Sequence, residues 1–491
     1  MAFQKIKLTD YPFLLDIEGQ YSTEFIVSNN AIIIEKFTDS VTIAITDTSY
    51  SILTTYLEKY HYPLVVTFKY VPKPDFTSFI SNLLDGSTVS VNAKQGNQEN
   101  FSIDSLEQNA PVVNLINAMF IEAIRCNASD IHIEMTKDDT RIRYRIDGML
   151  KTVKSLPKDI FAAFSSRIKI MGNLNIMEKR LPQDGRMSVS IGGLSVDIRI
   201  SIVPTTEGES IALRIFNTSL ETMQLEQLGF SVESIETFDR IIKYPYGLIL
   251  VSGPTGSGKT TTLHALLKRL SAENLKIVTI EDPVEQILPN VTQIPINDKI
   301  DISFDSMLRR VLRHDPDVIM VGEIRDNATA ELAIRAALTG HLILSTIHTN
   351  DSASVITRLR NMNIEPFLIT SVLRCVIAQR LVRRICPHCA EKIDIVLSPE
   401  IKKKYSISDF TAKKGKGCNY CFNTGYKDRI AVAEYYCMSD GLEKLILEGA
   451  TTSEIFAYTI SKGMVSLFED GLCKVSQGIT SLEELEREVL S

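Results

Sequence analysis

One short loop, from residue 253 to residue 260, has the composition of a phosphate-binding loop. Its sequence, Gly-Pro-Thr-Gly-Ser-Gly-Lys-Thr, fits the pattern GxxxxGK[ST] in full. Glycines let backbone N–H groups converge on phosphate oxygens, the ammonium of Lys259 can reach the β- and γ-phosphates, and the hydroxyl of Thr260 can ligate Mg²⁺. The loop therefore predicts a nucleotide site with Mg²⁺, and a glycine-rich turn without nucleotide is the alternative. The residues expected to contact nucleotide are Gly253, Pro254, Thr255, Gly256, Ser257, Gly258, Lys259, Thr260 and Thr261.

Three apolar segments beyond this loop are each followed by polar residues that could act on a phosphate. They are residues 276–280, 317–321 and 342–344, and the polar residues that follow include Glu281, Glu323 and His348. Ligands of open α/β sheets lie beyond the carboxyl ends of the strands, so we expect these side chains to meet near the γ-phosphate. Glu323 or Glu281 could polarise the attacking water, and His348 could sense the phosphate. The alternatives are a helix-capping acid for Glu281 and a hydrogen-bonded buried imidazole for His348.

The metal and charge requirements of hydrolysis single out further positions. Gly322 stands where P-loop proteins usually carry the acid of the Mg²⁺-binding strand, so we expect metal contacts through water or through Glu281 and Asp282. Negative charge that develops on the γ-phosphate needs a positive partner. Arginines that could supply it include Arg309 and Arg313, which are four residues apart and predicted to share one helix face, and Arg325 and Arg358.

Four cysteines form two C-x₂-C pairs that are typical of a zinc site. Cys386 and Cys389 form the first pair, Cys418 and Cys421 the second, and 28 residues separate them. Two such tight turns supply the four thiolates that tetrahedral Zn²⁺ prefers. The spacing predicts structural zinc with a small helical insertion between the pairs; a redox dithiol or buried thiols are the alternatives.

The elements that must position these groups follow from hydrophobic periodicity. The apolar segment 247–251 precedes the phosphate loop, and leucines at helical spacing over 263–270 follow it. From about residue 245, short apolar strands separated by helices predict an α/β domain with a parallel sheet. Within residues 111–230, the segments on either side of Gly192-Gly193 alternate between apolar and polar residues, which predicts a hairpin, and Arg199 and Arg214 are expected on the polar faces of strands. This part is predicted to be a sheet-plus-helix domain.

Composition limits the class of protein. The 491 residues carry 53 Lys plus Arg against 60 Asp plus Glu, a net charge of −7, and 44% of them are hydrophobic. These values are typical of globular domains, and no apolar run reaches the length of about 20 residues that a membrane span needs. We expect a cytoplasmic protein with reduced cysteines, and the acidic balance argues against nucleic acid as a partner.

Taken together, residues 110–480 resemble the ATPases of type II secretion systems and type IV pilus assembly. The likeness rests on the phosphate loop and on six further motifs, which are residues 128–134, 145–148, 180–186, 280–285, 315–326 and 339–350. Within that family, Glu281 lies in the "Asp box", Glu323 is the Walker B glutamate, and His341 to His348 is the "His box". A glycine at position 322 is usual there. The stretch around Arg429 departs from the family pattern, which leaves its role open.

The resemblance implies a domain plan and an activity. The implied activity is ATP hydrolysis with Mg²⁺ by a homohexamer that is recruited to the bacterial inner membrane. In such a motor, Arg199 and Arg214 would close over the bound nucleotide. Residues 85–110 are rich in Gly, Ser, Asn and Gln, a composition that itself predicts a flexible linker. The other expected parts are an N-terminal α+β adaptor (1–84) for an inner-membrane platform protein, a PAS-like arginine-bearing domain (111–230), a RecA-like P-loop core (231–385), a four-cysteine zinc module (386–425) and a C-terminal helical region (426–491).

The implied task is to power protein secretion by pseudopilus assembly. Extension of a type IV pilus is the nearest alternative, because the two kinds of motor share these motifs. A nucleic-acid translocase and a nucleotide-gated scaffold without hydrolysis are the alternatives from other classes.

Overall fold

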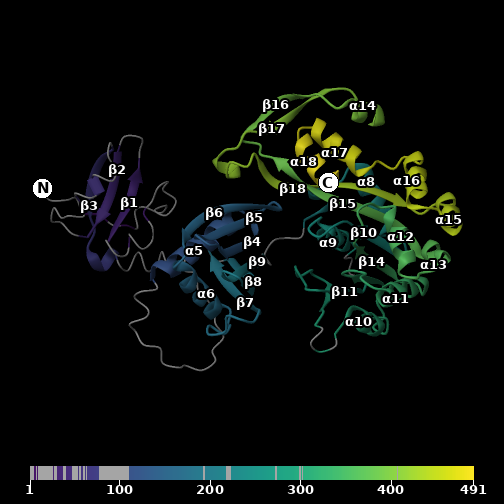
Figure 1. Cartoon of the computed structure of the whole chain (residues 1–491), viewed down its shortest axis with the longest axis horizontal. Helices are drawn as coiled ribbons and strands as arrows, with labels where there is room; N and C mark the ends of the chain where they lie inside the picture. The colour runs from purple at the N-terminus through teal and green to yellow at the C-terminus, as the bar shows by residue number, and fades with distance from the viewer. Residues whose placement is uncertain are drawn as a thin grey trace. The chain divides into compact units, whose positions relative to one another are not determined.

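We describe the chain from a computed structural model (Figure 1). The described residues from 110 onward are 110–191, 194–216, 223–270, 274–297, 300, 302–405 and 407–490. Those before residue 110 are 5–6, 8, 21, 26, 30–36, 40–46, 54, 57–58, 61 and 64–76. The predicted linker, apart from Ala110, lies outside the described residues.

The N-terminal part contains a small three-stranded sheet. Its strands are β1 (Ala31–Lys36), β2 (Ser40–Ile45) and β3 (Val65–Tyr70). Strand β2 pairs with β1 in antiparallel and with β3 in parallel orientation. Apolar side chains of β1 and β2 are fully buried, Ile33 and Ile43 among them. This part therefore has a core of its own.

A six-stranded sheet with two helices follows. The helices are α5 (Ala110–Arg125) and α6 (Ile160–Met171). The strands are β4 (Ala128–Met135), β5 (Asp139–Ile146), β6 (Met149–Pro157), β7 (Gln183–Ile191), β8 (Leu194–Thr205) and β9 (Gly208–Phe216), in the order β6-β5-β4-β9-β8-β7. Ile198, Ile200 and Ile202 are buried, whereas Arg199 and Arg214 lie on the other face. The alternation predicted for β8 and β9 is confirmed.

The C-terminal half is built on a seven-stranded sheet in the order β12-β11-β13-β14-β10-β15-β18. The strands are β10 (Gly247–Ser252), β11 (Ile277–Glu281), β12 (Val291–Pro295), β13 (Val318–Val321), β14 (Leu342–Ile347), β15 (Leu373–Ile385) and β18 (Tyr426–Cys437). All neighbours pair in parallel except β15 and β18. The predicted α/β sheet is confirmed, and strand β10 lies inside it.

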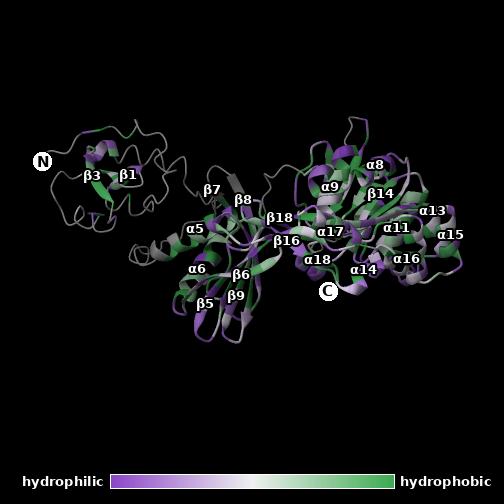
Figure 2. Cartoon of the chain, turned by 90° about the horizontal axis from the view of Figure 1, so that it is seen from above, coloured by the Kyte–Doolittle hydropathy of each residue, from purple (hydrophilic) through white to green (hydrophobic). Residues whose placement is uncertain are grey.

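Alternate residues of β10 face two layers of helices. Leu248 and Leu250 belong to a cluster with side chains of α10 to α13, and Ile249 and Val251 belong to one with side chains of α7 to α9. Figure 2 shows hydrophobic and hydrophilic residues side by side on helices of these layers such as α9 and α11, as expected for helices that cover a sheet. The helices are α7 (Leu225–Leu228), α8 (Val232–Ile241), α9 (Lys259–Leu270), α10 (Phe304–Val311), α11 (Asn327–Leu338), α12 (Ser354–Asn361) and α13 (Pro366–Val372).

The last part of the chain differs from the sequence prediction at two points. Between the cysteine pairs lies a β-hairpin, β16 (Ala390–Ile395) and β17 (Phe410–Gly415), in addition to a short helix α14 (Pro399–Tyr405). Residues 426–437, assigned to a helical region, form strand β18 instead, because their apolar positions complete the core sheet against β15. Helices α15 (Asp440–Leu447), α16 (Thr452–Ser461), α17 (Leu467–Ser476) and α18 (Leu482–Val489) follow.

Among the described residues, no helix has the length and apolar character that crossing a bilayer demands.

Candidate nucleotide site and metal centre

The phosphate-binding loop connects β10 to α9, as its sequence predicts. The ammonium of Lys259 is largely buried and donates to the backbone oxygens of Gly253 and Pro254, at 2.8 and 2.9 Å. The loop thus curls around its own lysine. The open N–H groups of the first turn of α9 and the lysine charge make this end of the helix a site for anions.

Two glycines of the loop have conformations that other residues rarely adopt. Gly253 has φ +144° and Gly258 has φ +86°. A Cβ atom on Gly253 would lie 2.5 Å from the backbone oxygen of Gln379, which is closer than any carbon side chain tolerates. These positions therefore need glycine both for backbone conformation and for close packing against β15.

The environment of Lys259 changes its acidity. Burial, opposed by the charge of Glu323 and assisted by that of Arg380, lowers the pKa of this ammonium to about 8. A bound triphosphate favours the charged form and raises the pKa again. Because the free site loses its proton near pH 8, binding of the triphosphate requires proton uptake at higher pH.

We therefore expect the affinity for ATP to fall as the pH rises above 8. The dissociation constant should increase by up to about tenfold per pH unit, since one proton must be taken up for each nucleotide bound. Equilibrium binding of a fluorescent ATP analogue from pH 6.5 to 9.5 measures this dependence. Lys259→Arg keeps its charge over the whole range and should give a flat profile; an equal slope in both proteins would show that another group titrates.

Glu323 and His348, at the ends of β13 and β14, meet as the sequence predicts. The Nε2 atom of His348 lies 3.3 Å from a carboxylate oxygen of Glu323, and the guanidinium of Arg325 pairs with the other oxygen. Burial would raise the pKa of Glu323, but the hydrogen bond and charge of Arg325, with His348, outweigh it and lower the pKa. Glu323 is thus a carboxylate at neutral pH and can accept a hydrogen bond from water. The side chain of His348 is 47% exposed, so the alternative of a buried imidazole is wrong.

Hydroxyl groups of β14 hold the two strand ends in place. Ser345 Oγ donates to the backbone oxygen of Val321, and Thr346 Oγ1 donates to that of Gly322, both at 2.7 Å. Both donors are buried. They anchor the segment that carries Glu323 to the strand that carries His348.

Gly322 is a glycine because it packs closely against the neighbouring strand. Its N–H donates to the backbone oxygen of Ile280 at 2.8 Å, and an added Cβ would lie 3.1 Å from that oxygen. Position 322 therefore has little room for the acid that other P-loop proteins carry there.

Glu281 is buried in the sheet and has several hydrogen-bond donors. Its carboxylate accepts from Thr279 at 2.6 Å and from Gln293 at 2.9 Å, and His264 Nε2 lies 3.1 Å away. Burial would raise the pKa of Glu281, but these donors lower it. Only 2% of the residue is exposed, so Glu281 has less access to an attacking water than Glu323. His264, on α9, was missed by the sequence analysis, which had no signal for its pairing with β11.

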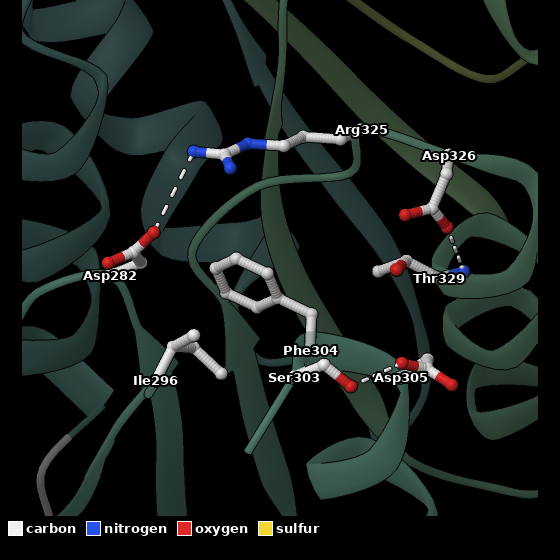
Figure 3. Close-up of a pocket in the computed structure, with 8 residues that line it drawn as sticks. All are labelled: Asp282, Ile296, Ser303, Phe304, Asp305, Arg325, Asp326 and Thr329. Carbon is white, nitrogen blue, oxygen red and sulfur yellow. Dashed lines mark hydrogen bonds and ion pairs between the residues drawn. The ribbon is translucent and has the colours of Figure 1, made fainter. Parts of the chain in front are cut away.

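A pocket of about 150 Å³ lies beside these strand ends (Figure 3). The guanidinium of Arg325 extends across it towards Asp282, with 3.9 Å between nitrogen and oxygen. Asp326 faces away from that pair and accepts from the N–H of Thr329 at 2.8 Å, which caps α11. Of the charged residues in this segment, Arg325 therefore remains close to Glu323 and Asp282, whereas Asp326 has a structural task.

Arg199 and Arg214 line a second pocket, of about 530 Å³, on the six-stranded sheet. They lie directly opposite each other on β8 and β9, and Arg186 joins them. Like charges in this position repel, and burial together with Arg186 lowers the pKa of Arg199. Asp130 compensates in part, at 2.9 Å from Arg214. An anion in the pocket would relieve the repulsion. Arg186 was not predicted as a site residue from the sequence, although it lies in the motif formed by residues 180–186.

The other arginines of the sequence analysis have different surroundings. Helix α10 ends before Arg313, so the prediction that Arg309 and Arg313 share a helix face is wrong; instead, Arg313 donates to the backbone oxygen of Arg309. Arg358 lies in the last turn of α12. Arg429 lies on β18 with its Nε atom 4.0 Å from Asp147.

The four cysteines come together as predicted. Their sulfur atoms all lie within 4.8 Å of one another, and three of the separations are 3.7 to 3.8 Å. Zinc–sulfur bonds of about 2.3 Å place tetrahedral sulfurs about 3.8 Å apart. Backbone N–H groups of Gly417 and Gly425 donate to sulfurs of Cys389 and Cys421 at 3.3 Å, an arrangement that suits thiolates. The residues therefore fit a tetrahedral metal such as Zn²⁺.

A largely parallel sheet, a GxxxxGKT loop that opens a helix, and a glutamate and histidine on neighbouring strand ends define a P-loop ATPase. More narrowly, the chain belongs to the type II/IV secretion system protein family, whose sequence model matches residues 105–487.

Individual proteins support this assignment. The chain is 44% identical over 381 residues to the type II secretion system protein HxcR of Pseudomonas aeruginosa, covering 78% of each chain. It is 43% identical over 397 residues to the type IV pilus assembly ATPase PilB of Myxococcus xanthus, covering 79% of this chain and 70% of PilB. The structure of the Legionella pneumophila ATPase DotB matches with a TM-score of 0.57 at 21% identity, over 81% of this chain and 98% of DotB, which supports the fold.

Proposed function

We propose that this chain hydrolyses ATP to power protein secretion through a type II secretion system, by driving pseudopilus assembly. The observation that carries the proposal is the pairing of Glu323 with His348, in a site where the charge of Glu323 also acts on Lys259 of the phosphate loop. The similarity to HxcR, a type II secretion system protein, supports the choice of this secretion system. The nearly equal similarity to PilB keeps extension of a type IV pilus as the second candidate.

In the proposed reaction, each residue has a defined task. Lys259 leaves the loop oxygens that it now contacts and binds the β- and γ-phosphates. Glu323 accepts a hydrogen bond from the attacking water, and His348 keeps the carboxylate in place and contacts the γ-phosphate. Thr260, with Glu281 or Asp282, would hold Mg²⁺, which neutralises phosphate charge when bound.

We further propose that Arg199 and Arg214 close over the triphosphate, as the resemblance implies. Three arginines around one pocket support an anionic ligand, because their mutual repulsion decreases when it binds. Charge then develops on the γ-phosphate next to fixed guanidinium groups, which is where catalysis needs it.

Assembly and location are also proposals. We propose a homohexamer, held peripherally at the cytoplasmic face of the bacterial inner membrane through residues 1–84, which bind the cytoplasmic part of a platform protein. The domain boundaries and the PAS-like character of residues 111–230 remain predictions. The net charge of −7 favours a protein partner over nucleic acid.

A pull-down from membranes distinguishes the two candidate functions. The full-length chain should retain an inner-membrane protein of the secretion platform, and a chain that lacks residues 1–84 should not. Recovery of a pilus-assembly platform instead would move the proposal to the second candidate. Equal recovery with and without residues 1–84 would contradict the adaptor assignment.

We propose that the four cysteines hold one structural Zn²⁺. Cys421→Ser or chelation should remove the metal and leave the β16–β17 hairpin disordered, because binding free energy on the order of 10 kcal/mol is lost. Metal analysis should find one zinc per chain, and hydrogen exchange over residues 386–425 should report the loss of order. Cys473→Ser, at an exposed cysteine, is the matched control. A chain that purifies without zinc and keeps the hairpin protected would refute the proposal.

A further inference from the structure

We infer that Gln379 is a positioning residue for the phosphate-binding loop, a task that none of the loop, strand-end or arginine motifs assigns. Gln379 lies on β15, and this strand lies between β10 and β18 in the sheet. Its backbone neighbour Ala378 pairs with Ser252, the last residue of β10. The side chain therefore starts at the level where the chain leaves the sheet and enters the loop. The inference rests on the proposed use of ATP and adds to it.

The amide of Gln379 connects the loop to the helix that follows it. Its Nε2 atom donates to the backbone oxygen of Ser257 at 2.6 Å, and its Oε1 atom accepts from the hydroxyl of Thr262 at 2.8 Å. Gln379 and Thr262 are each 1% exposed. The amide orientation follows from chemistry, because the reverse orientation would place two oxygens, that of the amide and that of Ser257, against each other.

The contact with Ser257 fixes the direction of a phosphate donor. The oxygen of Ser257 and the N–H of Gly258 belong to one planar trans peptide and point in opposite directions. A carbonyl held by Gln379 on the sheet side therefore directs the N–H of Gly258 away from β15, into the concave side of the loop. This N–H is among the groups that a phosphate loop aims at its ligand.

The surroundings leave the loop little freedom to reach this orientation in another way. A Cβ on Gly258 would lie 3.0 Å from Nε2 of Gln379, so the side chain is in close contact with the loop. Without its donor, the buried oxygen of Ser257 would lack a partner on that side and the peptide could rotate. The expected consequence is weaker phosphate binding that affects ground state and transition state alike, and hence a raised KM with a nearly unchanged kcat.

The test compares Gln379→Met, which keeps the volume and removes both hydrogen bonds, with Thr262→Val, which removes only the hydroxyl bond. We expect Gln379→Met to raise the KM for ATP and the dissociation constant of a fluorescent ATP analogue about tenfold, with kcat within about twofold. Thr262→Val should change the KM and the dissociation constant much less than Gln379→Met does. Its melting temperature without nucleotide should nevertheless fall by an amount similar to that of Gln379→Met. A merely structural role predicts lower melting temperatures and unchanged constants in both variants, which would overturn the inference.

Gln379→Glu supplies a second test if Gln379→Met does not fold. A protonated carboxyl can donate to Ser257 and accept from Thr262 as the amide does, whereas a carboxylate cannot donate. The ratio of its KM to the KM of the wild type, both measured at the same pH, should be close to one at pH 6 and rise towards ten by pH 9. A KM equal to that of the wild type throughout would overturn the inference. Wild-type protein that binds the analogue but releases no phosphate would contradict the proposed function alone.

Discussion

Lys259→Ala should abolish measurable ATP turnover while the protein keeps its fold. The ammonium is the group in the loop that can neutralise β- and γ-phosphate charge, and the residue that carries it is largely buried. Loss of such a group from a preorganised site costs roughly a hundred- to thousandfold in kcat, in addition to weaker nucleotide binding. Phosphate release under saturating Mg-ATP measures the effect.

The fold should survive because, among the described residues, the hydrogen bonds of the Lys259 ammonium go to backbone oxygens of its own loop, at Gly253 and Pro254. The circular dichroism spectrum and the measured metal content should match those of the wild type. Lys268→Ala, on the exposed side of the same helix, controls for a change in helix α9 and should leave turnover unchanged. Turnover of Lys259→Ala near the wild-type rate would remove the phosphate loop from the reaction.

Glu323→Gln should lower kcat by about a hundred- to ten-thousandfold and leave ATP bound. The amide is isosteric, but it replaces an acceptor that is ionised at neutral pH, and it loses the charge that pairs with Arg325 and His348. ATP binding should persist, because no phosphate contact is lost and one negative charge near the triphosphate disappears. Phosphate release and retention of radiolabelled ATP on a spin column measure the two effects.

The matched control for this variant is Glu331→Gln. Glu331 lies on the exposed face of α11 and pairs with Arg335, so its amide variant should hydrolyse ATP like the wild type. If Glu323→Gln turned over ATP at a comparable rate, another group would have to activate the water.

The sequence analysis identified the residues whose task depends on local pattern. A P-loop needs a strand, a glycine-rich turn and a helix in direct succession, so Lys259 could be placed on the first turn of α9 from spacing alone. Parallel strands end on one edge of a sheet, which placed Glu323 beside His348. The cysteine pairs could be joined because two tight turns suffice for a tetrahedral metal.

Other features depend on contacts between distant segments, and the local pattern does not contain them. The pairing of Glu281 with His264 joins β11 to α9, and the amide of Gln379 joins β15 to the phosphate loop. Strand β18 was assigned to a helical region because its place against β15 depends on a partner more than 40 residues away, beyond the cysteine insertion. In these cases the partner of each residue or strand depends on which side chains are buried together, and this follows only from the order of the strands in the sheet.

In the proposed reaction Glu323, and not the buried Glu281, activates the attacking water. Single-turnover hydrolysis of bound radiolabelled ATP, stopped by acid quench, compares Glu323→Gln and Glu281→Gln directly. We expect intact ATP to remain on Glu323→Gln, and Glu281→Gln to form ADP faster than Glu323→Gln does, with a lower melting temperature because a buried hydrogen-bonded carboxylate is lost. ADP formation by Glu323→Gln at the wild-type rate, with intact ATP on Glu281→Gln, would contradict the account.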